Sequence, residues 1–280
     1  MEINLEEYLE HTGFTTPSGK GVGIAIIDTG CNLKNDKIVY TYNGFTGTTD
    51  VTDPKGHGTT ITDIIHRIAP ESNLYIMKGL DDYGSGDMLS VYNCLARCRD
   101  IEDIDLICMS FSSYKNLSQT TQNALNGCLK EGKLMFASIG NDNKKTPTYP
   151  SSIEGVYKVG ALNADLTGKE KESNFFTYTS FVALGENIDS LGETYHGTSF
   201  ANAIVVAQVA NIMSDNQLSR QETTYEYLKK HFREKNRKLE TAFGSLYKEE
   251  THVEDLQTTN RIDRFEGKES EERSTDQSFL

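Results

Sequence analysis

The sequence predicts an α/β protein with a three-layer, doubly wound and mostly parallel sheet. Short, continuous apolar runs alternate with longer segments of helical periodicity along most of the chain. Strands that are buried on both faces have such runs, and these strands occur almost only in parallel sheets covered by helices. Strands and helices that alternate at this spacing indicate right-handed crossover connections. The length of 280 residues allows one large domain or two small ones.

The expected elements follow one another from residue 21 onward, after a short helical arm and a loop in residues 1–20. Apolar runs predict strands at 21–27, 74–80, 104–111, 133–138 and 156–161. Helical spacing of apolar residues predicts helices at 60–68, 88–99 and 120–131, and a buried helix that includes 201–210. Pro70 ends the first of these helices, because proline lacks the N–H that a continuing helix needs.

The character of the chain changes after residue 215, which we expect to end the main domain (21–215). Residues 216–245 are basic and carry an apolar stripe of Tyr225, Leu228 and Phe232. This stripe favours a helix packed on the main domain over an independent binding module. Residues 246–280 are acidic and contain few apolar side chains, which indicates a solvated, flexible tail.

The overall charge and the ends of the chain limit the class of partner. A net charge of −13 argues against nucleic acid or an anionic membrane as the main partner. The sequence has no apolar segment long enough for a membrane-spanning helix. Its acidic N-terminus lacks the basic start and apolar stretch of a signal peptide. We therefore expect a cytoplasmic protein, and the sequence makes no prediction of its oligomeric state.

The five cysteines predict reduced, buried thiols and not a metal site. Their odd number, together with the absence of a signal peptide, disfavours a disulfide framework. Cys94 and Cys98 are spaced to share a helix face, but no second pair of cysteine or histidine ligands accompanies them. We expect no metal and no cofactor.

Two polar residues, Asp28 and His57, lie at the ends of expected elements, where α/β proteins place their functional sites. Asp28 ends the first apolar run, at the carboxyl end of a strand. It either has a functional role or only turns the chain together with Gly30, and the two interpretations have equal weight. His57 lies between Gly56 and Gly58 at the start of a helix, so the backbone can approach it closely. Considered alone, such a histidine is usually a structural group, whereas the flanking glycines indicate a crowded site.

Ser199 stands where a polar turn meets the buried helix. Considered alone, Thr198 or Ser199 is best interpreted as an N-cap, since serine and threonine are ordinary capping residues. The alternative is that Ser199 is a nucleophile whose developing oxyanion is received by the free N–H groups of the first turn. Asn141, which follows Gly140 after another expected strand, supplies a further polar group.

Taken together, these segments resemble the subtilisin-like serine peptidases (subtilases). Their order along the chain, Asp then His then Ser, is that of the subtilisin triad. The resemblance covers roughly residues 20–212. It is carried by segments 22–30, 56–59, 140–141, 149–161 and 197–201.

The resemblance implies a role for each residue. Ser199 attacks the scissile carbonyl, and His57 takes its proton and later delivers it to the leaving amine. Asp28 holds the imidazole in the correct tautomer. The side-chain amide of Asn141 binds the oxyanion together with the backbone N–H of Ser199.

The resemblance also implies that an extended peptide is clamped between two edge segments of the protein. Asp142 falls at the rim of the primary pocket, where a carboxylate favours a basic residue before the scissile bond. A solvent-facing turn residue is the equally weighted alternative. The edge segments consist of Gly84, Ser85 and Gly86 on one side, and Ser110, Phe111 and Ser112 on the other.

The predicted function is therefore that of a serine endopeptidase acting on peptide or protein substrates. Ser112 stands where the family generally has glycine, which narrows the pocket. The helix after His57 lacks the insertion that forms a common calcium site, so no calcium is inferred. Maturation of one dedicated precursor peptide is a narrower possibility within this function. The alternative is a catalytically silent member of the family that binds peptides.

Overall fold

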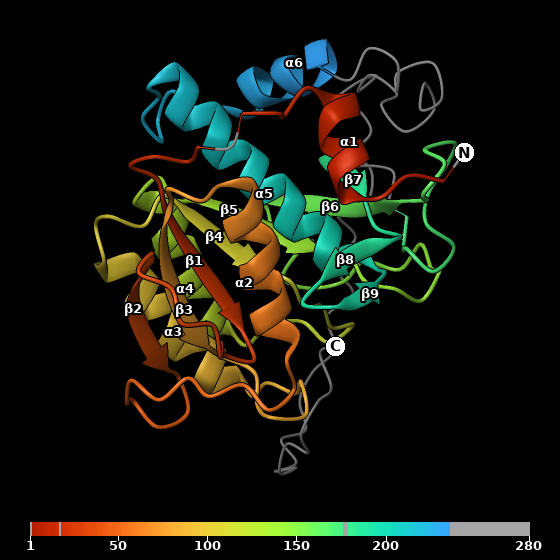
Figure 1. The fold of residues 1–280 in the computed structure, drawn as a ribbon. Coiled ribbons are helices and arrows are strands. Elements are labelled where there is room, and N and C mark those ends of the chain that lie inside the picture. The colour runs from red at the N-terminus through yellow and green to blue at the C-terminus, as the bar shows by residue number, and fades with distance from the viewer. Residues whose placement is uncertain (1, 17, 176–178, 236–280) are drawn as a thin grey trace, which may run out of the picture.

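Within the residues that the structure describes, seven strands form one parallel sheet (Figure 1). The structure is a computed structural model, and it describes residues 2–16, 18–175 and 179–235. The strands of the sheet are β1 (Gly23–Asp28), β2 (Ile38–Asn43), β3 (Asn73–Lys78), β4 (Leu106–Met109), β5 (Leu134–Ser138), β6 (Val156–Leu162) and β7 (Phe181–Leu184). Their order is β2-β3-β1-β4-β5-β6-β7, and each neighbouring pair is parallel.

Helices cover both faces of this sheet and form the outer two of three layers. They are α1 (Leu5–Thr12), α2 (His57–Ile68), α3 (Met88–Asp100), α4 (Gln119–Lys130), α5 (Thr198–Asn216) and α6 (Tyr225–Lys235). One apolar core lies between the sheet and α2 and α5, and a second lies between the sheet and α3 and α4. Figure 1 shows α2 and α5 side by side across one face. The predicted fold class is confirmed.

The central strand β1 explains why the sequence has an uninterrupted apolar run. All of its residues are buried. Ile24 and Ile26 belong to the core beneath α2 and α5, whereas Ala25 and Ile27 belong to the core on the other face. Alternate side chains of a strand point to opposite faces, so a strand between two helical layers must be apolar on both.

Four strands, each short or lying at an edge, were not predicted from the sequence. β2 is the edge strand and is only partly buried, so its sequence mixes apolar and polar residues. β7 lies at the opposite edge of the sheet. An antiparallel hairpin, β8 (Ile188–Ser190) with β9 (Glu193–Tyr195), precedes α5. Strands this short give too few residues for an alternating pattern to be recognised.

The end of the described chain packs on the same core as α5. Leu228 and Phe232 of α6 are buried, and the Phe232 ring lies 5.2 Å from that of Phe181 in β7. Phe14, which follows α1, lies 5.9 Å from Phe232. The division of the chain at residues 20, 215 and 245 stays a prediction. The expected acidic tail, 246–280, lies outside the described residues.

The five cysteines are buried and form no disulfide. Burial raises the pKa of the Cys108 thiol to about 12, so this group is protonated at neutral pH.

Across the described ranges, no cluster of three or more His, Cys, Asp or Glu side chains is arranged to hold a metal ion. In the same part of the chain, no helix combines the length and apolar character needed to cross a bilayer.

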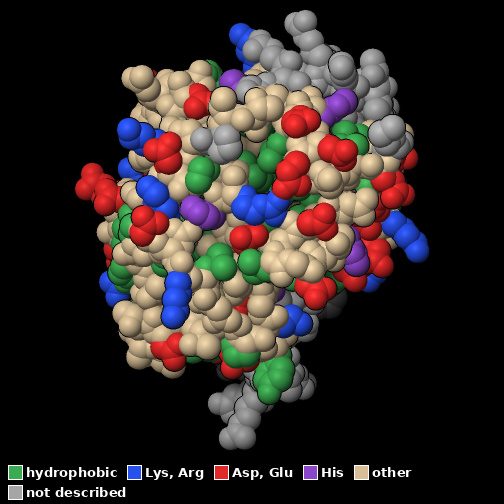
Figure 2. All heavy atoms as spheres, viewed as in Figure 1, with side chains coloured by type: hydrophobic (Ala, Val, Ile, Leu, Met, Phe, Trp, Pro, Cys, Tyr) green, Lys and Arg blue, Asp and Glu red, His purple; other side chains and the backbone are tan. Residues whose placement is uncertain are grey.

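On the face of the molecule seen in Figure 2, acidic and basic side chains are interspersed on the left, whereas acidic side chains predominate on the upper right.

Candidate active site

The carboxyl ends of neighbouring strands meet at one edge of the sheet, and most of the predicted site residues lie there. β1, β4 and β5 are adjacent in the sheet; Asp28 ends β1, and the loops after the three strands carry residues 29–30, 110–113 and 140–142. α2 and α5 both begin at this edge, with His57 and Ser199 in their first turns. A cleft of about 720 Å³ opens between these segments. Open α/β sheets place their sites at this edge.

Asp28 and His57 form a buried pair. His57 Nδ1 lies 2.7 Å from Asp28 Oδ1, and the two side chains are 14% and 1% exposed. A carboxylate only accepts hydrogen bonds, so Nδ1 carries the proton of this contact and Nε2 is left with its lone pair. The same carboxylate oxygen accepts the backbone N–H of Thr29 at 2.7 Å. The tautomer and ring orientation of His57 are therefore set by Asp28.

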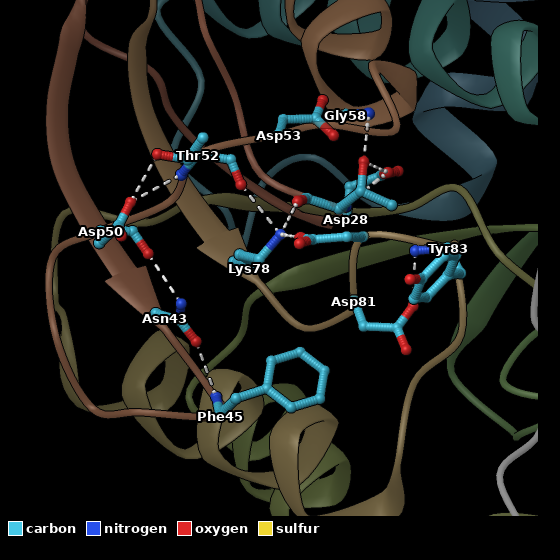
Figure 3. Close-up of polar contacts among 12 residues, drawn as sticks. Asp28, Asn43, Phe45, Asp50, Thr52, Asp53, Gly58, Lys78, Asp81 and Tyr83 are labelled. Atoms are coloured by element: carbon cyan, nitrogen blue, oxygen red, sulfur yellow. Dashed lines mark hydrogen bonds and ion pairs between the residues drawn. The ribbon is translucent and has the colours of Figure 1, made fainter.

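A second buried carboxylate, that of Asp53, holds the turn in which His57 lies. Its Oδ1 accepts the N–H of Gly56 at 2.9 Å, and its Oδ2 accepts the N–H of Thr59 at 2.8 Å and the hydroxyl of Thr59 at 2.6 Å. On the other side of the turn, Thr29 Oγ1 accepts the N–H of Gly58 at 2.9 Å (Figure 3). Gly56 caps α2 with a positive φ of 83° and offers no side chain for the purpose. Asp53 and Thr29 together therefore supply side-chain acceptors for the first turn of α2.

Gly58 is required by the close approach of two segments. A Cβ atom on this residue would lie 2.3 Å from the carbonyl oxygen of Gly30 and 3.1 Å from the Cβ of Asp28. Any side chain would push the start of α2 away from the end of β1. The contact between Asp28 and His57 depends on this glycine.

The start of α5 differs from the capping interpretation of the sequence. The N-cap is Gly197, whose positive φ of 123° favours glycine, and neither Thr198 nor Ser199 is the cap. Ser199 is instead the second helical residue, and its N–H has no partner within the helix. The N–H of Thr198 is satisfied by the side chain of Asn141, whose Oδ1 accepts it at 2.9 Å.

Asn141 is fixed by its oxygen, and this leaves its amide donors for other contacts. The hydroxyl of Thr198 also donates to Asn141 Oδ1, at 2.9 Å, and accepts the N–H of Gly140 at 3.2 Å. Asn141 Nδ2 lies 3.1 Å from the position that a Cβ on Gly197 would take. The side-chain amide is thus held at the N-terminus of α5, close to Ser199.

The hydroxyl of Ser199 points to Ser110, just after β4, and not to His57. It donates to the carbonyl oxygen of Ser110 at 2.9 Å, and the hydroxyl of Ser110 donates to the carbonyl oxygen of Ser199 at 2.9 Å. Over the described residues no hydrogen bond joins Ser199 to His57. The two are linked through Phe200, whose ring centroid lies 5.7 Å from that of His57.

The cleft contains some of the predicted substrate-binding residues and excludes others. Ser110 is fully buried, and Asp28 lies behind His57, so neither lines the cleft. The turn of Gly84, Ser85 and Gly86, just before α3, is also absent from the described lining. The predicted residues that do line it are His57, Phe111, Ser112, Asn141, Asp142 and Ser199.

Sequence reasoning missed several residues that shape this cleft. Tyr114 donates its hydroxyl to Asp142 Oδ2 at 2.8 Å, across the mouth of the cleft. The buried side chain of Asn174 accepts the N–H groups of Asp142 and Lys144 at 3.1 and 2.8 Å, and so fixes the loop after β5. Lys55, Lys115 and His196 also line the cleft. A lone tyrosine or asparagine carries no local pattern that would reveal such a contact.

Comparison with known proteins places the chain in a family. The sequence model of the subtilase family matches residues 19–257. The chain belongs to the subtilase family, which confirms the resemblance that its motifs indicated.

The relatives include named serine proteases. The chain is 32% identical to the minor extracellular protease Epr of Bacillus subtilis over 69% of its own length, but it spans only 32% of that relative. It is 27% identical to an intracellular serine protease of Paenibacillus polymyxa, over 85% of this chain and 82% of the relative. The crystal structure of a cold adapted subtilisin-like serine proteinase shares the fold, with a TM-score of 0.66 and 23% identity over 74% of this chain and 81% of that one.

The carboxylate of Asp53 predicts an acid-dependent loss of stability. Burial raises its pKa, but hydrogen bonds from Thr59, Thr29 and the backbone outweigh this effect and hold the pKa below the ordinary value of 3.8. A carboxylate with a lowered pKa stabilises the fold above its unfolded-state pKa, and this contribution is lost as the pH falls through the folded-state value.

We therefore expect Asp53→Asn to lower the free energy of unfolding at pH 7 by about 1–3 kcal/mol, because a charged acceptor of buried N–H groups is lost. Below about pH 4 the variant should lose less further stability than the wild type does. Urea unfolding between pH 3 and pH 7 measures both effects. The exposed residue change Asp36→Asn is the control. An unchanged acid dependence in Asp53→Asn would contradict the assignment.

Proposed function

We propose that this chain is a serine endopeptidase that hydrolyses peptide bonds in extended polypeptide substrates. The observation that carries the proposal is the meeting of His57, Asn141 and Ser199 around one cleft, with Asp28 bonded to His57 from behind. These residues come from four separate segments of the chain. The proposal agrees with membership of the subtilase family and with the named activity of its relatives.

In the proposed reaction, the hydroxyl of Ser199 turns from the Ser110 carbonyl to His57 and attacks the scissile carbonyl. His57 Nε2 takes the hydroxyl proton and delivers it to the amine that leaves. Asp28 stabilises the imidazolium that forms in between. A water molecule, activated by the same imidazole, then attacks the acyl-enzyme and releases Ser199. The contact between Asp28 and His57 supports this assignment of roles. Because Nδ1 is bonded to Asp28, Nε2 is left to accept the proton of the Ser199 hydroxyl.

The proposed oxyanion hole consists of the backbone N–H of Ser199 and the amide Nδ2 of Asn141. Two features support it. The N–H of the second residue of a helix has no intrahelical partner. Asn141 is anchored through its oxygen, and among the described residues its nitrogen makes no hydrogen bond. Donors that are fixed before the reaction stabilise the developing charge without reorganisation.

We also propose that the substrate lies in extended form between residues 84–86 and 110–112, with Asp142 at the rim of the pocket. The narrower proposals are that the substrate is one dedicated precursor peptide and that the enzyme acts inside the cell. The relative from Paenibacillus polymyxa is named an intracellular serine protease, and this chain is similar to it over 82% of its length. Cleavage of a peptide library, followed by mass spectrometry, distinguishes a dedicated sequence preference from general turnover.

A fluorophosphonate that reacts with activated serines tests the proposal directly. We expect the wild-type chain to be labelled at Ser199. Ser199→Ala should abolish labelling and lower peptidase activity by a factor on the order of 10⁶, the scale that removal of such a nucleophile has in subtilisin. Ser190→Ala, a change outside the cleft, is the control. Folded wild-type protein that takes up no label would instead indicate a catalytically silent, peptide-binding member of the family.

Asn141 offers a second test, in which its two proposed roles are separated. Asn141→Asp keeps the oxygen that accepts the N–H of Thr198 but loses the donor to the oxyanion. We expect kcat to fall at least about 10²–10³-fold, the range found when one such donor is removed. The thermal midpoint should stay close to that of the wild type, because the acceptor at the start of α5 is retained. A wild-type kcat would refute the role of Asn141.

The carboxylate of Asp142 predicts a modest preference for lysine or arginine before the scissile bond. Asp142→Asn should reduce this preference by a factor of about 1.5–5, which corresponds to the 0.2–1 kcal/mol of an exposed ion pair. Tyr114→Phe removes the hydroxyl that occupies one carboxylate oxygen, so it should increase the preference. Rates with matched substrates that differ only in this residue provide the measurement. If the ratio of the two rates is the same in the wild type, Asp142→Asn and Tyr114→Phe, Asp142 is only a turn residue.

A further inference from the structure

Lys78 is a buried cation at the edge of the sheet where the site lies, and the proposed reaction does not use it. It is the last residue of β3, is only 6% exposed, and stands opposite Asp28 in the parallel register of β1 and β3. Side chains paired in this way point to the same face of a sheet. Lys78 and Asp28 therefore both extend toward the face covered by α2.

The ammonium group of Lys78 is fully bonded. Its Nζ donates to the carbonyl oxygen of Thr29 at 2.6 Å, to that of Thr52 at 3.0 Å and to Asp82 Oδ1 at 2.9 Å (Figure 3). A lysine has three donors, so none is left over. A buried charge is tolerated only when it is bonded in this way. The three acceptors are consequently held at fixed positions around one nitrogen atom.

Two of these acceptors belong to the segments that hold the buried pair of Asp28 and His57. Thr29 follows Asp28, bonds to its carboxylate through its own N–H, and accepts the N–H of Gly58 in α2. Thr52 directly precedes Asp53, the carboxylate that binds both ends of the His57 turn. Lys78 therefore ties the segment that ends in Asp28 to the segment that carries His57.

The third acceptor leads to the proposed substrate edge. Asp82 lies in the turn that contains residues 84–86, and this turn is closed by Asp81, whose Oδ1 accepts the N–H groups of Tyr83 and Ser85 at 2.9 Å each. The Asp82 side chain is 54% exposed, so the ion pair between Lys78 and Asp82 is partly open to solvent, unlike the other two bonds of Lys78. This ion pair attaches the turn to the end of β3.

From this arrangement we infer that Lys78 is a positioning residue with two separable effects. Its bonds to Thr29 and Thr52 set the placement of His57 relative to Asp28, and its bond to Asp82 sets the position of the substrate edge at residues 84–86. The inference rests on the proposed peptidase function.

Lys133 provides a matched control, because it is a second buried lysine with carbonyl acceptors. It is 2% exposed, and its Nζ donates to the carbonyl oxygens of Ile101 and Ile104 at 2.6 and 2.8 Å. It precedes β5, so it lies at the amino edge of the sheet, away from the cleft. Lys133→Met and Lys78→Met therefore remove the same kind of group from comparable surroundings.

The experiment measures fluorophosphonate labelling rates together with kcat and KM, for a single-residue ester and for a tetrapeptide anilide. We expect Lys78→Met to lower the labelling rate and kcat at least tenfold, and Lys78→Arg, which keeps the charge and the donors, to recover part of this loss. Asp82→Ala should raise KM for the tetrapeptide at least threefold while the labelling rate stays within twofold of wild type. Lys133→Met should lower the thermal midpoint but leave kcat within twofold.

The outcomes separate this inference from the proposed function. An unlabelled wild type refutes the function itself. If the wild type is labelled, two results overturn the role of Lys78 alone. One is a kcat and a labelling rate in Lys78→Met that equal those of the wild type. The other is a loss of kcat in Lys133→Met as large as that in Lys78→Met. If Lys78→Met does not fold, the test rests on Asp82→Ala. A KM of Asp82→Ala for the tetrapeptide that equals the wild-type value then overturns the inference.

Discussion

The burial of one carboxylate, that of Asp28, determines how the rest of the site is built. A carboxylate that is 1% exposed must be bonded, since an unpaired buried charge is costly. Its Oδ1 is bonded by Thr29 and His57, whereas its Oδ2 has no hydrogen-bond partner among the described residues. The carboxylate therefore holds the imidazole ring of His57 from behind. The proton transfer that we propose from Ser199 requires a base that is held in this way.

Around this carboxylate, polar contacts join segments that are far apart in the sequence. Thr29 and Asp53 hold the His57 turn from two sides, and Lys78 bonds to the backbone beside each of them. Such networks tolerate little movement, because removing one member leaves other buried groups without partners. The rigid part of the site is therefore the pair of Asp28 and His57, while the cleft walls near Tyr114 and Asp142 depend on an exposed hydrogen bond.

The sequence was sufficient to predict the fold class and some of the residues that line the cleft. Both followed from strong local patterns: an apolar run that ends in Asp28, glycines beside His57, and Ser199 before a buried helix. The contacts of Asp53, Lys78 and Asn174 could not be predicted in this way. Each depends on which strand ends are adjacent, and no local pattern encodes that order. The acceptor for the first N–H of α5 was missed for the same reason, since it is Asn141 in a distant loop.

The resting orientation of Ser199 fits the proposed chemistry on energetic grounds. Its hydroxyl gives up one hydrogen bond to the Ser110 carbonyl when it turns to His57. Such a bond contributes about 0.5–1.5 kcal/mol net, whereas one oxyanion-hole donor typically stabilises the transition state by about 2.7–4 kcal/mol. Catalytic hydrogen bonds are often poorly aligned in structures without substrate and form only in the complex. The cost of the rotation is therefore smaller than the stabilisation that Asn141 alone would supply once substrate is bound.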